Sequence, residues 1–173
     1  ISTQVGCRMG CRFCASTLGG LVRDLTPGEM LEEVYTLERV CAPQGQKVGG
    51  VVLMGIGEPL DNFENVCAFL EILSCPEGKN LSLRHVSLST CGLIPQIGRL
   101  AEKNYPLTLS ISLHAPDDTA RSTLMPVNAK YPVAPLLEAC RQYFKRTGRR
   151  ISFEYALVAG KNDAPEQASR LGE

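Results

Sequence analysis

Short apolar runs that are rich in β-branched residues recur along the chain, and each predicts a buried strand. Four such runs stand out, at residues 48–54, 85–89, 107–113 and 151–158. Residues 1–5 are a weaker candidate for one more strand. The pattern therefore predicts four or five strands, spread over the whole chain.

Helical patterns lie between these runs. Thr26, Pro27 and Glu29 form a helix start, with a capping hydroxyl, a proline at the first helical position and an acid in the first turn. Apolar residues then follow at helical spacing as far as Val40. Gly148 is placed to end the last of three further helices, which are predicted at residues 62–73, 94–103 and 133–146.

The alternation of strands and helices predicts an α/β fold with a parallel sheet and right-handed crossovers. Five such units either curl into a partial barrel or form an open doubly wound sheet, and periodicity alone does not decide between them. In both arrangements functional residues collect at the carboxyl ends of the strands. No repeat, low-complexity tract or linker interrupts residues 1–173, so we expect one domain.

Polar or glycine-rich segments follow the predicted strands. They are residues 7–14, 55–59, 89–92 and 112–115. Because the carboxyl ends of parallel strands share one edge of the sheet, we expect these four segments to meet in a single site.

The composition is that of a globular chain, with 44% hydrophobic and 21% charged residues. No apolar run reaches the ~18 residues of a membrane span. Lys plus Arg and Asp plus Glu are both 18, so the net charge is zero, which argues against a strongly basic nucleic-acid domain but leaves room for a local basic patch. The chain begins without a Met or a signal peptide and ends in ASRLGE, which resembles part of a helix, so we expect a segment of a longer protein.

Eight cysteines are present, and they fit a reducing cytosol better than a disulfide framework, because the chain has a large apolar fraction and no secretory signal. Cys67 and Cys140 fall in predicted helices, where a free cysteine is usually buried, so we expect both to be structural.

Cys7, Cys11 and Cys14 fall within eight residues, and three kinds of site compete for them. A closed zinc site needs four ligands, usually from paired Cys-x-x-Cys knuckles, and only one such pair is present. A thioredoxin-type redox pair would use Cys11 and Cys14 and leave the third thiol unexplained. An iron–sulfur cluster would use all three, because a [4Fe–4S] cluster takes four ligands and three thiolates leave one iron open to a small molecule.

The spacing C-x-x-x-C-x-x-C, with an aromatic residue before the last cysteine, resembles the radical S-adenosylmethionine (SAM) superfamily. Neighbouring segments resemble its RlmN-type branch, dual-specificity RNA methyltransferases that methylate C2 of adenosine. From Ser2 to Asp163 these segments are, in order, QVGCRMGCRFC, VVLMGIGEPLDN, VSLSTCGLIP, SISLHAPDD, LMPVNAKYP and FEYALVAGKND. The resemblance implies a partial (β/α) TIM-like barrel of the radical SAM type, with five of six strands present.

The resemblance also implies a cofactor site. Cys7, Cys11 and Cys14 would bind three irons of a [4Fe–4S] cluster, and SAM would chelate the fourth. Gly57 and Glu58 resemble the SAM-binding turn, where a glycine lets the backbone approach the ligand and a carboxylate can accept from the SAM ammonium. The remaining matches to SAM-contacting positions of the family are Ser89, Ser112, Leu113 and His114. Phe13 would pack beside the cluster and the adenine.

By the same resemblance, the methyl group passes through cysteines outside residues 1–173. A first SAM methylates a cysteine that would lie after Glu173, a radical from a second SAM abstracts hydrogen from that methyl group, and a resolving cysteine immediately before Ile1 completes the cycle. We therefore expect no catalytic residue within residues 1–173. These residues would form a truncated radical SAM core domain, and this domain on its own would not methylate RNA. The implied partners are 23S rRNA, tRNA and an electron donor such as flavodoxin. The resemblance also implies that the protein is a cytoplasmic monomer with no membrane contact.

Two other functions stay open. The sister Cfr-type branch methylates C8 of the same ribosomal adenosine and shares the cysteine triad and the Gly-Glu-Pro turn. The segment SLHAPDD favours the C2 enzyme, because SLHSP is expected in the C8 branch. A non-catalytic iron–sulfur or zinc module is the second alternative.

Overall fold

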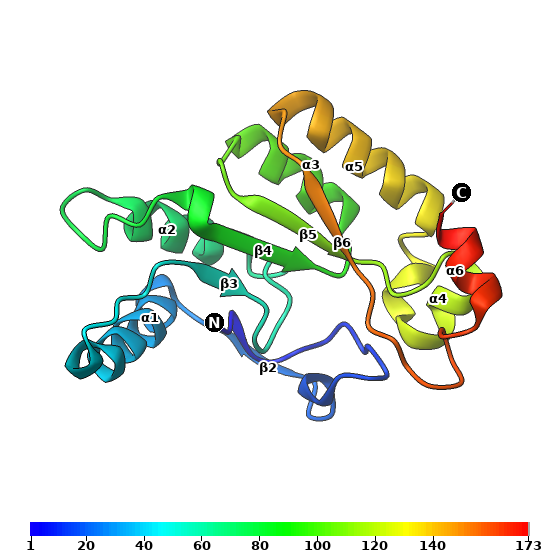
Figure 1. Ribbon diagram of the computed structural model, residues 1–173, viewed down its shortest axis with the longest axis horizontal. Helices are drawn as coiled ribbons and strands as arrows, with labels where there is room; N and C mark the ends of the chain where they lie inside the picture. Colours follow the sequence, from blue (N-terminus) through cyan, green and yellow to red (C-terminus); the bar gives the residue numbers. More distant parts are fainter. Residues whose placement is uncertain (173) are drawn as a thin grey trace.

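The computed structural model describes residues 1–172, and a four-stranded parallel sheet organises them (Figure 1). The strands, paired in chain order, are β3 (Val51–Leu53), β4 (Val86–Thr90), β5 (Thr108–Ser112) and β6 (Ile151–Glu154). All three pairings are parallel. The predicted α/β fold with a parallel sheet is therefore confirmed.

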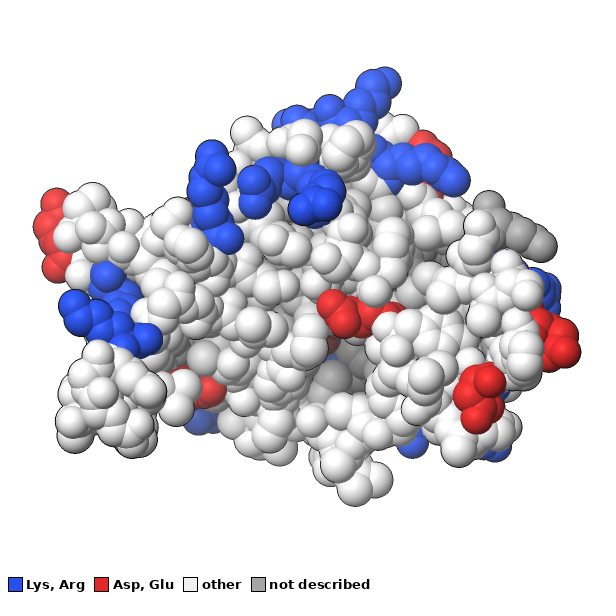
Figure 2. Space-filling view, viewed as in Figure 1, with Lys and Arg blue, Asp and Glu red and all other residues white. Residues whose placement is uncertain are grey.

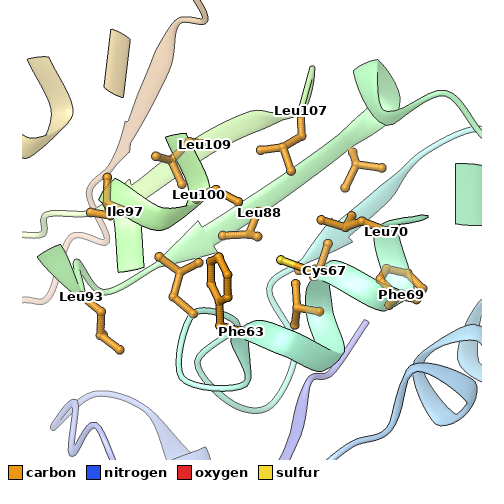
Figure 3. Close-up of a cluster of buried hydrophobic side chains, with 14 of the residues drawn as sticks. Phe63, Cys67, Phe69, Leu70, Leu88, Leu93, Ile97, Leu100, Leu107 and Leu109 are labelled. Atoms are coloured by element: carbon orange, nitrogen blue, oxygen red, sulfur yellow. The ribbon is translucent and has the colours of Figure 1, made fainter. Parts of the chain in front are cut away.

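Four helices connect the strands, close to the predicted positions. They are α1 (Pro27–Cys41), α2 (Phe63–Ser74), α3 (Ile94–Lys103) and α5 (Val133–Thr147). Figure 3 shows side chains of α2 and α3 packed against those of β4 and β5, in a core where Leu88, Ile97 and Leu109 are fully buried. Cys67 and Cys140 are also buried in this core, as expected for structural cysteines.

The ends of two helices form as the sequence predicts. The Thr26 hydroxyl accepts from the Glu29 N–H at 3.3 Å, and the Glu29 carboxylate accepts from the Thr26 N–H at 2.9 Å, so α1 begins with a reciprocal capping box. Gly148 adopts a left-handed conformation, with φ of 64°, and ends α5.

The N-terminal strand differs from the prediction. β1 (Gln4–Gly6) does not join the parallel sheet but pairs antiparallel with β2 (Leu21–Asp24), below the sheet in Figure 1. Only the residues before β1 run beside β3, where the Ile1 amino group donates to the Val52 carbonyl at 2.7 Å. The chain turns away at Gly6, which has φ of 78° and lies so close to the Gly20 carbonyl that no side chain fits there.

Several elements have bounds that the sequence did not predict. The structure adds β2 and a short helix, α4 (Asp118–Leu124). The predicted strand 151–158 ends at Glu154, because the residues after it form a loop around the buried side chain of Asn162, whose amide bonds the Val158 N–H and the Ala156 carbonyl at 2.7 Å each. The predicted C-terminal helix is α6 (Pro165–Leu171), and Glu173 lies outside the described residues.

Charge is unevenly spread although the net charge is zero. Figure 2 shows lysine and arginine side chains gathered at the top of the view, where Figure 1 places the end of α5. The last turn of α5 and the segment after it contain Lys145, Arg146, Arg149 and Arg150. Within residues 1–172, no helix has the length and apolar character needed to cross a bilayer.

Candidate functional site

A cavity of about 400 Å³ lies where the four segments after the strands meet, as predicted from the topology. Its wall includes all three clustered cysteines and all but one of the predicted SAM contacts: Cys7, Cys11, Cys14, Gly57, Glu58, Ser89, Ser112 and His114. Leu113 is not part of the wall. Both of its backbone groups are engaged, because its N–H donates to the Glu154 carbonyl at 3.1 Å and its carbonyl accepts from Arg121 at 3.1 Å.

The cysteine loop is anchored on two sides. The Cys7 N–H donates to the Gly20 carbonyl at 3.0 Å, which ties the loop to the β1–β2 hairpin. The Arg12 N–H donates to the Leu124 carbonyl at 2.8 Å, which ties it to α4. All three thiols are free, with Cys7 buried and Cys11 and Cys14 half-buried. The chain therefore holds the three sulfur atoms at one wall of the cavity without a disulfide.

The thiols of this loop are suited to bind positively charged iron. Burial first, and then the neighbouring thiols of Cys7 and Cys14, raise the pKa of Cys11 to about 11. Iron provides the positive charge that lets such thiols ionise and bind. Within residues 1–172 no three His, Cys, Asp or Glu side chains converge on one metal ion. A [4Fe–4S] cluster does not need such convergence, because each thiolate binds a different iron.

Glu58 is buried under the turn that follows β3. One carboxylate oxygen accepts from the Cys91 N–H at 2.8 Å and the other from the Leu60 N–H at 3.0 Å. Burial raises the pKa of Glu58, and the hydrogen bonds from Cys91 oppose that shift. Glu58 lines the cavity, and its contact with the SAM ammonium stays a prediction.

Gly57 owes its identity to a protein contact. Its φ is 105°, and an added Cβ would lie 2.6 Å from the Cβ of Gln4. The Gln4 side chain in turn accepts from the Glu58 N–H at 2.9 Å and donates to Asp24 and Asp61 at 2.8 and 3.0 Å. Gln4 thereby fixes the turn after β3 to the β1–β2 hairpin. The residue type of Gln4 does not reveal this role in the sequence.

His114 presents a neutral ring to the cavity. Its Nδ1 accepts from the Ala156 N–H at 3.0 Å, so the neutral ring carries its proton on Nε2. Burial lowers the pKa of His114, and the charge of Arg121 lowers it further. The Phe13 and His114 rings pack in a T-shaped arrangement, with their centroids 5.0 Å apart. Across the cavity wall, the hydroxyl oxygens of Ser89 and Ser112 lie 3.5 Å apart, and either can turn toward a ligand.

Cys91 is a fourth cysteine on the cavity wall, and it belongs to the segment 89–92 that was expected to reach the site. Burial raises the pKa of its thiol, and the charge of Glu58 raises it further. The Cys91 N–H donates to the Glu58 carboxylate at 2.8 Å, so Cys91 supports Glu58 from the cavity wall.

Relatives of this chain match it over almost its whole length. A probable dual-specificity RNA methyltransferase RlmN of Clostridium botulinum (strain Hall) is 53% identical over 171 residues, which are 99% of this chain and 49% of that protein. A protein of the same name from Desulforudis audaxviator is 54% identical over 173 residues, 100% of this chain and 54% of the relative. The chain thus spans about half the length of these relatives.

Two solved structures share the fold. A radical SAM methyltransferase from Sphaerobacter thermophilus superposes with a TM-score of 0.96 at 44% identity, over 99% of this chain and 50% of that one. Streptococcus suis SuiB bound to S-adenosylmethionine superposes with a TM-score of 0.66 at 18% identity, over 98% of this chain and 35% of that one, and shows the fold alone. The model of the radical SAM superfamily matches residues 1–171. The chain therefore belongs to the radical SAM superfamily, whose cofactors are a [4Fe–4S] cluster and SAM.

Proposed function

We propose that this chain is the cofactor-binding core of an RNA methyltransferase that adds a methyl group to C2 of adenosine in 23S rRNA and tRNA. The observation that supports it best is one cavity that joins the cysteine loop to the tips of four parallel strands. Relatives that are 53% identical over 99% of the chain are named dual-specificity RNA methyltransferases, which supports RNA as the substrate.

The residues of the cavity have separate tasks in this proposal. Cys7, Cys11 and Cys14 would hold the cluster, because they are the free thiols of the anchored loop. When bound, the cluster and SAM supply a 5′-deoxyadenosyl radical, which abstracts hydrogen. The chain's own contribution is to position and to exclude water, and the packing of Phe13 against His114 serves the second task.

Polar groups around the cavity would hold SAM. Glu58 offers a carboxylate to its ammonium group, and the His114 ring offers an Nε2–H donor. Ser89 and Ser112 offer hydroxyl groups from the ends of β4 and β5. Gly57 would act indirectly, by letting the turn that contains Glu58 approach Gln4.

The remaining parts of the proposal concern the whole protein. Residues 1–173 would form its radical SAM core domain, and the methyl-carrying and resolving cysteines would lie outside them. The protein would act in the cytoplasm as a monomer, on 23S rRNA and tRNA, and would receive electrons from a donor such as flavodoxin. These statements follow from the resemblance to the RlmN-type branch.

Substitution of one cysteine tests the cluster assignment. In full-length protein reconstituted anaerobically with iron and sulfide, Cys11→Ala should abolish the brown chromophore, because one iron loses its thiolate. The matched control is Cys41→Ala, since Cys41 is also a half-buried free cysteine but lies at the end of α1, outside the cavity wall. An unchanged iron content in Cys11→Ala would contradict the assignment.

The position of the methyl group separates the C2 and C8 reactions. Mass spectrometry of 23S rRNA and tRNA from cells that lack the gene, with and without the gene restored, should show C2-methyladenosine only after restoration. C8-methyladenosine in its place would support the sister branch. A purified protein that binds a cluster but forms no 5′-deoxyadenosine with SAM and dithionite would be a binding module and no enzyme.

A further inference from the structure

Arg121 of α4 is a fully buried cation without a carboxylate partner. Its exposed fraction is 0%, and it heads the fully buried side chains ranked by size. Among residues 1–172, no ion pair includes Arg121. The arginine and lysine side chains that do form ion pairs are mostly exposed. Burial of an unpaired charge is unfavourable, so a folded chain that keeps one needs a compensating reason.

Neutral oxygen atoms satisfy the whole guanidinium group. Its N–H groups donate to four backbone carbonyls and one side-chain amide, at distances from 2.7 to 3.2 Å. The acceptors are the carbonyls of Cys91, Ser112, Leu113 and Tyr131 and the Oδ1 of Asn128. This arrangement keeps the guanidinium in place and leaves its positive charge uncompensated by direct contact.

The acceptors place this charge behind the cavity wall. Cys91 follows β4, and Ser112 ends β5, so Arg121 holds together the carboxyl ends of two neighbouring strands. Both residues also line the cavity. The same helix ends at Leu124, whose carbonyl accepts from the Arg12 N–H of the cysteine loop at 2.8 Å. Helix α4 therefore joins the cysteine loop to the strand tips.

The guanidinium of Arg121 lies directly behind the cavity wall, because its Nη2–H groups donate to the carbonyls of Cys91 and Ser112, two residues that line the cavity. Cys91 also donates its N–H to the buried carboxylate of Glu58 at 2.8 Å, on the same wall. Among residues 1–172 no ion pair neutralises the guanidinium, so its field acts on charge that is added inside the cavity.

We propose that Arg121 is a positioning residue of the cofactor site, which fixes the carboxyl ends of β4 and β5 and stabilises added negative charge on the cluster held by the cysteine loop. This inference rests on the proposed function. A positive charge fixed near a cluster favours its reduced state, because one electron from a low-potential donor adds one negative charge there. Loss of the charge should make the cluster harder to reduce.

Potentiometric titration of the reconstituted full-length protein, followed by electron paramagnetic resonance, tests this role. Arg121→Met removes the charge and keeps much of the volume, and it should lower the equilibrium constant for reduction at least tenfold, a shift of about 59 mV to more negative potential. Arg121→Lys keeps the charge and loses the planar fork, so its potential should stay near that of the wild type. The control is Arg141→Met, which removes an exposed arginine of α5 and should leave the potential unchanged.

Thermal unfolding and iron content, measured on the same samples, separate this role from a merely structural one. Both Arg121 variants lose hydrogen bonds and should melt earlier, but only Arg121→Met should shift the potential. A wild-type potential in Arg121→Met, equal shifts in the two variants, or loss of the cluster from both would overturn the electrostatic role. A wild-type protein that takes up no cluster would overturn the proposed function itself, and this inference with it.

Discussion

Gly57 and Gln4 are packed so closely that a methyl group on residue 57 would overlap the Gln4 side chain. The distance from an added Cβ to the Gln4 Cβ is 2.6 Å, and to its backbone nitrogen 2.9 Å. The left-handed φ of 105° disfavours any other residue as well. The shape of the turn that contains Glu58 therefore depends on a hydrogen atom in place of a side chain.

Gly57→Ala should weaken SAM binding more than tenfold. The alanine costs about 1–3 kcal/mol of backbone strain and pushes the turn away from Gln4, so the Glu58 carboxylate moves with it. Isothermal titration calorimetry with SAM on the cluster-loaded protein measures the effect. Wild-type affinity in this variant would show that the turn does not contact the ligand.

Gly28→Ala is the matched control for that variant. An added Cβ at Gly28 meets nothing within 4 Å, and the residue lies in the first turn of α1. Alanine is favoured over glycine in a helix by up to about 1 kcal/mol, so this variant should melt at the same temperature or slightly higher and bind SAM like the wild type.

Residue type decided which members of the site could be predicted. Cysteine and histidine suggest chemistry on sight, and a glycine beside a glutamate after a strand suggests a ligand turn, so these were found. Arginine and glutamine are usually exposed, and nothing near Arg121 or Gln4 in the sequence marks them as buried. Their partners lie on other strands and loops, so only the folded chain reveals what they do.

Helix α1 begins with a charge network that makes its stability depend on pH. Hydrogen bonds from Arg23, and then from the Thr26 N–H, lower the pKa of Glu29 from 4.5 to about 2. A carboxyl group whose pKa is lower in the folded state stabilises the fold above its unfolded pKa, and this contribution disappears as the pH falls through the folded value. The relevant window therefore runs from about pH 4.5 down to pH 2.

Glu29→Gln should lose this contribution and keep the cap, because glutamine also fits the third position of a capping box. In urea unfolding, the difference in free energy between wild type and variant should be constant above pH 5 and shrink towards pH 2. Because the pair is largely exposed, high salt should reduce the difference. The same comparison in an Arg23→Met background should show a weaker dependence on pH, because only the hydrogen bonds from Thr26 then lower the pKa of Glu29. A difference that grows as the pH falls would contradict the assignment.

Elements with a strong local pattern were predicted, and those held by distant contacts were not. Strands β3, β4 and β5 are rich in buried β-branched and leucine residues, which mark them locally, whereas β6, predicted as a buried strand too, has no buried residue because it lies at the edge of the sheet. Strand β2 is almost wholly exposed, and α4 has seven residues, too few for a helical period to stand out. The apolar run after Glu154 looks like more strand, but Asn162 bonds the backbone there into a loop.

The sheet of the whole molecule ends in an open edge. Among the described residues β6 pairs only with β5, and Phe153 on β6 is 47% exposed beside Phe144, which is also exposed. An unpaired apolar strand edge invites pairing with another chain. Residues 1–173 expressed alone should therefore self-associate.

Phe153→Lys should reduce that association, because it places a charge on the open edge. Sedimentation velocity over a concentration series of the isolated segment measures it. The control is Leu171→Lys, since Leu171 is 44% exposed but lies on α6, away from any strand edge. Equal reduction by both variants would mean that net charge, and not the edge, governs association.

Topology made the location of the site predictable for the whole molecule. Parallel strands place their carboxyl ends together, so the segments that follow β3, β4 and β5 had to meet. The N-terminal strand escaped this logic, because Gly6 turns it into a hairpin with β2. Its residues still reach the site, but through hydrogen bonds of Gln4 and Cys7 that no local pattern foretells.

The bond between Arg12 and Leu124 has a consequence for synthesis of the protein. The cysteine loop leaves the ribosome before the helix that fixes its other side, because α4 follows β5 in the chain. During translation the three thiols are therefore present before their geometry is, exposed to oxidation and to stray metal ions. The loop gains its second anchor only when α4 has been made, so the order of the chain sets the earliest moment at which this wall of the cavity is complete.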